Sequence, residues 1–135
     1  MNILLVEDDD VSAEAVARSF KKNGVPFPLT HAEDGIQALE VLRGKHPAKQ
    51  VQRPMVVLLD LNMPRMNGFE FLQHLRADSE LKDLVVFVLT TSDAEEDRAK
   101  AYNQNVAGYM VKAAVGPQFR KLCILLDEYN SAVSL

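Results

Sequence analysis

Short runs of consecutive apolar residues alternate along the chain with segments whose apolar residues recur every three or four positions. The runs predict strands at residues 3–6, 28–32, 55–59, 84–89 and 107–111, the second being the weakest. The periodic segments predict helices at residues 11–23, 35–43, 68–76, 93–104 and 117–130. Strands that are apolar at every position are buried on both faces, which is typical of a parallel sheet covered by helices. The alternation therefore predicts a single α/β domain of five βα units.

Capping and turn residues mark the ends of several predicted helices. Asn23-Gly24 and Gly44 stand where C-caps are expected, and Asp9 and Asp10 precede the first helix as N-caps do. Ser92 to Glu95 (SDAE) has the spacing of a capping box at the start of the fourth helix. The polar segment 44–54 (GKHPAKQVQRP) is expected to be a solvated loop.

The composition is that of an ordinary globular protein. The chain of 135 residues is 47% hydrophobic and 25% charged, and its length suits one domain at residues 1–135. A net charge of −4 argues against non-specific nucleic-acid binding, which needs a basic face. The start of the chain has no secretory signal, and no apolar run reaches the length of a membrane span. One cysteine, Cys123, excludes an internal disulfide, so we expect a reducing, cytoplasmic location.

Chemically reactive side chains stand at the ends of four of the predicted strands. These are the acids Glu7, Asp8 and Asp9 after the first strand, Asp60 after the third, Thr90 after the fourth and Lys112 after the fifth. In an open parallel sheet, ligands bind outside the carboxyl ends of the strands, where the strand order reverses. With the order 2-1-3-4-5, the first and third strands are neighbours at that point, so Asp8 and Asp60 are expected to face each other. Thr90 is expected one strand away, and Lys112 beyond it.

This set of residues favours phosphoryl chemistry. Clustered carboxylates repel one another unless a cation lies among them, and hard oxygen ligands suit Mg²⁺. The metal and a lysine neutralise phosphoryl oxygens, a hydroxyl donates to one of them, and a carboxylate can itself accept the group as an aspartyl phosphate. Asp60, at the end of a buried strand and followed by the turn LNMPRMNG, is the candidate acceptor.

Four motifs resemble, in order, the landmarks of bacterial response-regulator receiver domains. They are ILLVEDD (3–9), LLDLNMPRMNGFEFL (58–72), VLTTS (88–92) and GYMVK (108–112), and the resemblance covers essentially the whole chain. It implies the flavodoxin-like (βα)5 fold of the chemotaxis regulator, with strand order 2-1-3-4-5. It also implies a cytoplasmic, non-enzymatic switch that catalyses no more than its own phosphoryl transfer and dephosphorylation.

The resemblance implies a role for each site residue. Asp60 would accept the phosphoryl group, with Thr90 and Lys112 contacting its oxygens and Tyr109 as the aromatic switch that follows Thr90. Mg²⁺ would be bound by Asp8 and Asp60, by Glu7 largely through water, and by the main-chain carbonyl of Asn62.

The same resemblance implies the partners. A sensor histidine kinase or phosphotransfer protein would supply the phosphoryl group, and the loop before the third strand together with the LTTS wording resembles small regulators paired with bacterial phytochromes. A downstream protein, or a second copy of the chain, would bind the face formed by residues 93–130.

Two positions depart from the family pattern. Lys112 is followed by Ala113 where a proline in a cis peptide is usual, so either this loop carries a costly cis non-proline bond or it runs trans. Thr91 stands where many members have alanine, and its larger side chain is expected to restrict small phosphodonors or to slow hydrolysis.

Other functions remain alternatives at this point. A phosphorylation-independent binding module is supported by the missing proline after Lys112 and opposed by the intact acids, threonine and lysine. A haloacid dehalogenase-type phosphatase requires a second acid two residues after its nucleophile, where this chain has Asn62. Neither a P-loop nor a G-x-G-x-x-G motif follows a strand. Whether such a regulator drives an output or passes phosphate onward is left open by the sequence.

Overall fold

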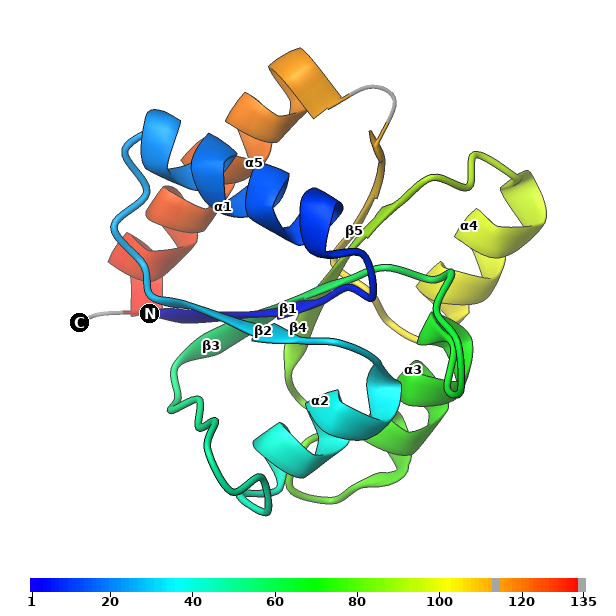
Figure 1. Ribbon diagram of the computed structural model, residues 1–135. Coiled ribbons are helices and arrows are strands. Elements are labelled where there is room, and N and C mark those ends of the chain that lie inside the picture. The colour runs from blue at the N-terminus through cyan, green and yellow to red at the C-terminus, as the bar shows by residue number, and fades with distance from the viewer. Residues whose placement is uncertain (113–114, 134–135) are drawn as a thin grey trace.

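The computed structural model describes residues 1–112 and 115–133, which form a five-stranded parallel sheet flanked by five helices (Figure 1). The elements follow in strict alternation: β1 (Asn2–Val6), α1 (Asp10–Lys22), β2 (Leu29–Ala32), α2 (Gly35–Leu42), β3 (Met55–Leu59), α3 (Gly68–Ala77), β4 (Val85–Thr90), α4 (Glu95–Asn103), β5 (Gly108–Val111) and α5 (Val115–Val133). The strand order is β2-β1-β3-β4-β5, and each neighbouring pair is parallel. The predicted α/β, flavodoxin-like fold and its strand order are confirmed.

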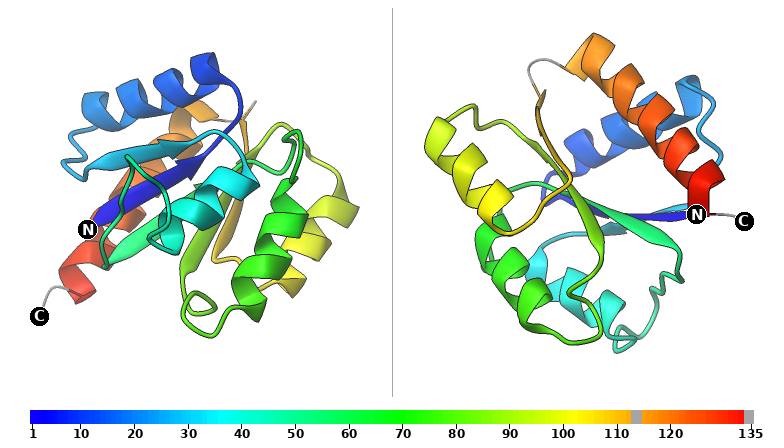
Figure 2. Two further views of the ribbon diagram at one scale, coloured as in Figure 1. Left: turned by 60° about the horizontal axis from the view of Figure 1, so that its bottom comes forward. Right: turned by 180° about the vertical axis from the view of Figure 1, so that it is seen from behind.

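The sheet separates two apolar layers. Helices α1 and α5 cover one face, and α2, α3 and α4 cover the other, as the views in Figures 1 and 2 show together. Phe20 and Leu126 anchor the core under α1 and α5, while Phe71 and Leu75 anchor the core under α2 to α4. All five residues of β3 are buried, as expected for a strand covered on both faces.

Several helix ends confirm the capping residues expected from the sequence. Asp9 is the N-cap of α1 and accepts a hydrogen bond from the Val11 amide at 3.0 Å. Asn23 is its C-cap, and Gly24 follows with a φ of +70°, a conformation that glycine adopts without strain. Gly44 ends α2 in the same way, with a φ of +71°.

The capping box predicted at Ser92 is wrong. Helix α4 begins at Glu95 with Ala94 as its N-cap, and no side chain caps it. Ser92 lies two residues too early, and its hydroxyl donates instead to Asp97 at 2.5 Å. The capping box lies at α3, where Asn67 and Glu70 satisfy each other's backbone amides.

The segment 44–54 is not a purely solvated loop. Val51 packs against the core beside α2 and α3, and the Lys49 ammonium donates to the carbonyl of His31 on the edge strand β2 at 2.6 Å. The question of a cis peptide after Lys112 falls on Ala113, which lies outside the described residues. None of the described helices combines the length and apolar character needed to cross a membrane.

Arg76, near the end of α3, joins three segments through its guanidinium. It donates to the carbonyls of Lys82 and Leu84 before β4, each at 2.7 Å, and to those of Gln104 and Asn105 after α4, at 2.8 and 3.1 Å. The C-terminal end of α4 is therefore fixed to α3 and to the start of β4.

We expect Arg76→Met to lower the free energy of unfolding by about 1–3 kcal/mol, because partly buried carbonyls lose their donors while the apolar stem is retained. Urea unfolding followed by circular dichroism measures this change. Arg18→Met is the matched control, since Arg18 is exposed on α1 and its ion pair with Glu14 is worth at most about 0.5 kcal/mol. Equal stability of the two variants would contradict the bracing role of Arg76.

Candidate functional site

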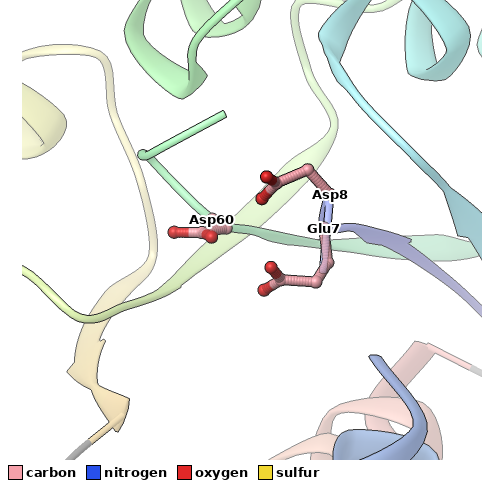
Figure 3. Close-up of side chains that lie close together, drawn as sticks. All are labelled: Glu7, Asp8 and Asp60. Carbon is pink, nitrogen blue, oxygen red and sulfur yellow. The ribbon is translucent and has the colours of Figure 1, made fainter. Parts of the chain in front are cut away.

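The parallel register of β1 and β3 brings three carboxylates together at the carboxyl edge of the sheet. Val6 pairs with Leu59, so Glu7 and Asp8 follow β1 beside the point where Asp60 follows β3. One carboxylate oxygen from each acid lies within 4.8 Å of the others. Figure 3 shows the three side chains converging from the two strand ends. Glu7 and Asp60 are buried, whereas Asp8 is exposed to solvent.

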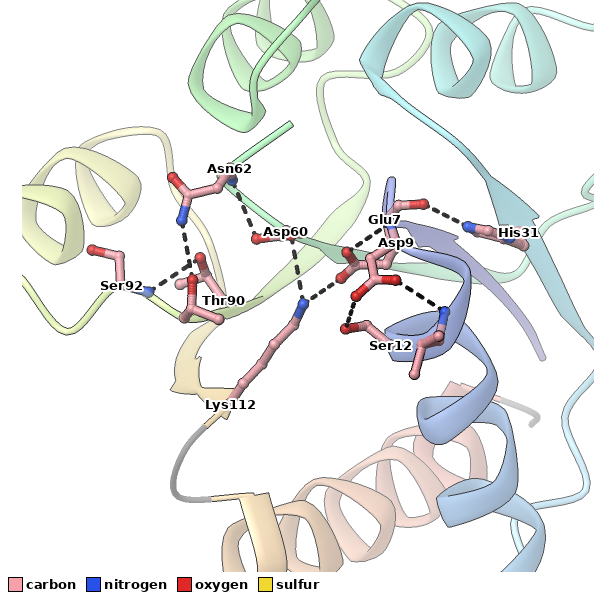
Figure 4. Close-up of polar contacts among 11 residues, drawn as sticks. Glu7, Asp9, Ser12, His31, Asp60, Asn62, Thr90, Ser92 and Lys112 are labelled. Carbon is pink, nitrogen blue, oxygen red and sulfur yellow. Dashed lines mark hydrogen bonds and ion pairs between the residues drawn. The ribbon is translucent and has the colours of Figure 1, made fainter. Parts of the chain in front are cut away.

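Lys112 reaches into this cluster from the end of β5. Its ammonium lies 2.5 Å from a Glu7 oxygen and 3.5 Å from an Asp60 oxygen, between the two acids in Figure 4. Lys112 follows β5, one strand beyond the strand that ends at Thr90, as the strand order predicted. Its long side chain reaches past the end of β4, so the ammonium faces the acids directly.

The pKa values of Glu7 and Lys112 are both raised, for different reasons. Burial raises the pKa of Glu7 to about 7, and the charge of Asp60 adds to this rise, although Lys112 opposes it. Burial alone lowers the pKa of Lys112, but its hydrogen bond to Glu7 and the charge of Asp60 outweigh burial, and the net pKa is raised. Three carboxylates with oxygens this close together fit a divalent cation with oxygen ligands.

The turn after β3 fixes the backbone around Asp60. The Asn62 amide donates to an Asp60 carboxylate oxygen at 3.2 Å, and the Gly68 amide donates to the Leu61 carbonyl at 3.0 Å. A Cβ atom at Gly68 would lie 2.7 Å from the Asp60 carbonyl oxygen and 2.7 Å from the Leu61 Cα. Glycine is therefore required here because the first turn of α3 packs directly on the chain that presents Asp60.

The loop after β4 closes the other side of the site. Thr90 is fully buried and its hydroxyl accepts a long hydrogen bond of 3.5 Å from the Ser92 amide. The Asn62 side chain donates to the Thr91 hydroxyl at 3.3 Å, which joins the loops after β3 and β4. Figure 4 shows Asn62, Thr90 and Ser92 on the same side of Asp60.

Tyr109 on β5 connects this loop to α4. Its hydroxyl donates to the Ser92 carbonyl at 2.8 Å, and the Arg98 guanidinium lies 4.8 Å from the ring centre. Burial raises the pKa of the Tyr109 hydroxyl. The predicted switch residue thus contacts the loop that begins at Thr90.

The structure places the expected site residues around the carboxyl edge of the sheet, and it adds a contact that the sequence did not suggest. His31 on β2 lies 2.5 Å from the Glu7 carbonyl oxygen through its ring Nε2. The three histidines of the chain have no metal-ligand spacing, so composition gave no reason to single out this one. Its place near the end of the strand beside β1 was the available signal.

A comparison with protein families accounts for this arrangement. The family model described as "Response regulator receiver domain" matches residues 3–123. The chain belongs to the response regulator receiver family. This confirms the resemblance drawn from the motifs, and it makes the chain a member of a family of signalling proteins of two-component systems.

Curated relatives and solved structures agree with the family. The chain is 33% identical over 127 residues to the probable methanogenesis regulatory protein FilR2 of Methanothrix harundinacea, covering 94% of this chain and 81% of that protein. It is 34% identical to the response regulator Rcp1 of a Synechocystis strain over 82% of this chain and 76% of Rcp1. The structure of the phosphorylated cyanobacterial phytochrome response regulator RcpA has a TM-score of 0.79 and 31% identity, covering 95% of this chain and 91% of RcpA. The Mn²⁺-bound form of Rcp1 has a TM-score of 0.76 and 32% identity, covering 90% and 87% of the two chains.

In metal-free buffer at pH 8, we expect Glu7→Gln to raise the free energy of unfolding by on the order of 1–3 kcal/mol, because it removes a buried charge. Between pH 4.5 and about 7 the folded wild type holds a proton that the unfolded chain releases, so wild-type stability falls as pH rises through this window. The advantage of the variant should therefore disappear as pH falls towards 4.5.

Urea unfolding of both proteins at several pH values between 4.5 and 8 tests this expectation. Glu14→Gln is the matched control, because Glu14 is exposed on α1 and should leave the pH dependence unchanged. A Glu7→Gln variant that is less stable than the wild type at pH 8 would show that the bond to Lys112 outweighs the cost of burial.

Proposed function

We propose that residues 1–135 act as a receiver domain whose Asp60 accepts a phosphoryl group from a histidine kinase or phosphotransfer protein. The observation that carries this proposal is the convergence of Glu7, Asp8, Asp60 and Lys112 at the carboxyl edge of a receiver fold. Catalysis at such a site consists mainly of positioning and of neutralising charge. The chain is in this view a cytoplasmic signalling switch and acts on no substrate other than its own phosphoryl group.

In the proposed transfer, an Asp60 carboxylate oxygen attacks the phosphorus atom of a phosphohistidine. A P–O bond to Asp60 forms while the P–N bond breaks, and the electron pair of that bond returns to the imidazole nitrogen. The Lys112 ammonium, already 3.5 Å from Asp60, is placed to contact a phosphoryl oxygen, and the Thr90 hydroxyl to donate to another. In dephosphorylation, water is the acceptor: its oxygen attacks phosphorus, the P–O bond to Asp60 breaks with its electron pair returning to the carboxylate, and inorganic phosphate and a proton are released.

We further propose Mg²⁺ as the cation of this site. The carboxylates of Asp8 and Asp60, the main-chain carbonyl of Asn62 and, largely through water, Glu7 would hold it. Support comes from the hard oxygen donors within 4.8 Å of one another and from the Mn²⁺-bound structure of the related Rcp1. When bound, the ion neutralises the charge of the carboxylates and of the transferred group.

The proposed output is a change in the face formed by residues 93–130. Tyr109 bonds the Ser92 carbonyl, so a shift of the loop at Thr90 reaches α4 and β5. Tyr102 and Leu125 are exposed beside a groove of about 260 Å³ between β5, α4 and α5. A downstream protein or a second copy of the chain would bind here. Similarity to the phytochrome response regulator RcpA and to the bacteriophytochrome response regulator RtBRR supports a bacterial phytochrome as one class of kinase.

Intact mass spectrometry after incubation with a small phosphodonor and Mg²⁺ tests the acceptor. We expect a gain of one phosphoryl group in the wild type and none in Asp60→Asn, because the amide is not a nucleophile. Asp9→Asn is the matched control, since Asp9 is an exposed helix cap near the site and should not affect the gain. If neither phosphorylation nor beryllofluoride binding occurs in the wild type, the proposal fails in favour of a phosphorylation-independent binding module.

We expect Thr91→Ala to speed both phosphorylation by small donors and loss of the phosphoryl group, by about fivefold. The substitution removes the bond of about 1 kcal/mol that holds the Asn62 side chain across the site. Thr91→Ser keeps the hydroxyl and removes the methyl group. It therefore separates the effect of the hydrogen bond to Asn62 on the two rates from the effect of side-chain bulk. The rates are measured by following the fraction of protein with the phosphorylated mass over time. Unchanged rates in Thr91→Ala would show that this side chain does not restrict access of small phosphodonors or water to Asp60.

A further inference from the structure

The carbonyl of Glu7 lies where the hydrogen-bond ladder between β1 and β2 stops. The Glu7 amide still donates to the Ala32 carbonyl of β2, at 3.0 Å. Strand β2 ends at Ala32, and the chain then turns into α2 through its N-cap Asp34. In a continuing parallel ladder, a backbone amide of the next strand would donate to the Glu7 carbonyl. That amide belongs to the segment that turns away.

The His31 ring takes the place of the departing amide. Its Nε2 lies 2.5 Å from the Glu7 carbonyl oxygen, and Figure 4 shows the ring pointing from β2 at the backbone of Glu7. A carbonyl oxygen only accepts, so Nε2 must carry the hydrogen in this contact. His31 therefore extends the β1–β2 ladder by one hydrogen bond, made by a side chain instead of the backbone.

This hydrogen bond acts on the peptide that joins two of the three clustered acids. The Glu7 carbonyl belongs to the same planar peptide group as the amide of Asp8, so holding its oxygen limits the rotation of the whole plane. The direction in which the Glu7 and Asp8 side chains leave the strand depends on that plane. Asp8 is exposed, and packing contributes little to its orientation.

His31 is itself held from the opposite side. The Lys49 ammonium donates to the His31 carbonyl at 2.6 Å and lies 3.4 Å from the Gln37 side-chain oxygen. The His46 ring accepts the amides of Ala48 and Lys49, at 3.1 and 2.9 Å, which shapes the loop that carries Lys49. The backbone of β2 is thus held at His31, which limits the movement of the ring that contacts Glu7.

We propose that His31 is a positioning residue for the cation site: its ring orients the Glu7–Asp8 peptide and thereby the two carboxylates that this peptide carries. The inference rests on the proposed function, because it assumes that these acids bind a divalent cation. His31 itself contacts no cation in this account and acts through the backbone alone.

The test is the affinity of the unphosphorylated protein for Mg²⁺ and for Mn²⁺, measured by isothermal titration calorimetry. His31→Phe keeps a ring and loses the hydrogen-bond donor. We expect it to lower the affinity for both cations by about tenfold, which is the lower end of the effect seen when a residue that orients metal ligands is replaced. His31→Gln places an N–H group near the position of Nε2 and should restore most of the affinity. His74→Phe replaces an exposed histidine on α3 and should change nothing.

Urea unfolding of each variant separates orientation from general stability. A structural role alone would lower the stability of His31→Phe and leave cation affinity as in the wild type, and this result would overturn the proposal. Equal weakening in His31→Phe and His31→Gln would overturn it as well, because the donated hydrogen bond would then not be the cause.

A measurement on the wild type keeps the proposal testable if a variant does not fold. Long-range ¹H–¹⁵N NMR correlation reports which ring nitrogen of His31 is protonated, and the proposal requires Nε2; a neutral ring protonated at Nδ1 alone would overturn it. Wild-type protein that binds neither cation would overturn this inference together with the cation site. Normal wild-type binding with an unaffected His31→Phe would overturn the inference alone.

Discussion

The grouping of three carboxylates, two of them buried, at one edge of the sheet is the constraint around which this site is arranged. The pairing of Val6 with Leu59 leaves Glu7, Asp8 and Asp60 together wherever the loops run, so their proximity is a property of the sheet. Lys112 is the cation that the described structure places among them, and burial, with a smaller contribution from the charge of Asp60, still raises the pKa of Glu7 to about 7. The opposing stability comes from the two apolar cores on either side of β1 and β3. A site with this excess of negative charge is poised to gain a cation.

The loops around the acids are held to different degrees. Asp34 caps α2 by accepting from the Gln37 amide at 2.9 Å, and it also accepts from the Arg65 Nε at 2.8 Å, which ties the loop after β2 to the loop after β3. The capping box at Asn67 fixes the start of α3. By contrast, α4 starts without a side-chain cap, and its one fully buried residue is Ala101. Little apolar contact and a weak start mark a segment that opens at low cost. Compared with the capped starts of α1, α2 and α3, the end of α4 nearest Thr90 is therefore expected to rearrange at lower cost, while Arg76 holds the other end.

The predictability of these features follows from the range of the forces involved. A strand buried on both faces has consecutive apolar residues, which a short stretch of sequence reveals. The order of the elements and the acids at the ends of β1 and β3 could therefore be predicted from local pattern. The strand order correctly placed Lys112 two strands from Asp60, but it could not show the contacts of the ammonium, because strand order fixes Cα positions and not the reach of a four-carbon side chain. The predicted capping box at Ser92 was wrong because α4 begins at Glu95, two residues later than the spacing required. The same spacing from Asn67 to Glu70 was present in the sequence and forms the capping box of α3. The His31 contact depends on where β2 stops relative to β1, and no periodicity in either segment encodes that.

The electrostatic balance of the site explains why one lysine suffices for two roles in the proposed mechanism. Three ionised carboxylates carry three negative charges, and Lys112 with one divalent cation supplies three positive charges, so the loaded site is neutral. The proposed phosphorylation would replace the single charge of Asp60 with the greater negative charge of an acyl phosphate, and the same ammonium would then face the phosphoryl oxygens. The added charge appears next to Thr90 and the loop bonded by Tyr109. Because this loop continues into the start of α4, which has no side-chain cap, the excess charge that the proposed phosphorylation would create at Asp60 would act next to a weakly held segment.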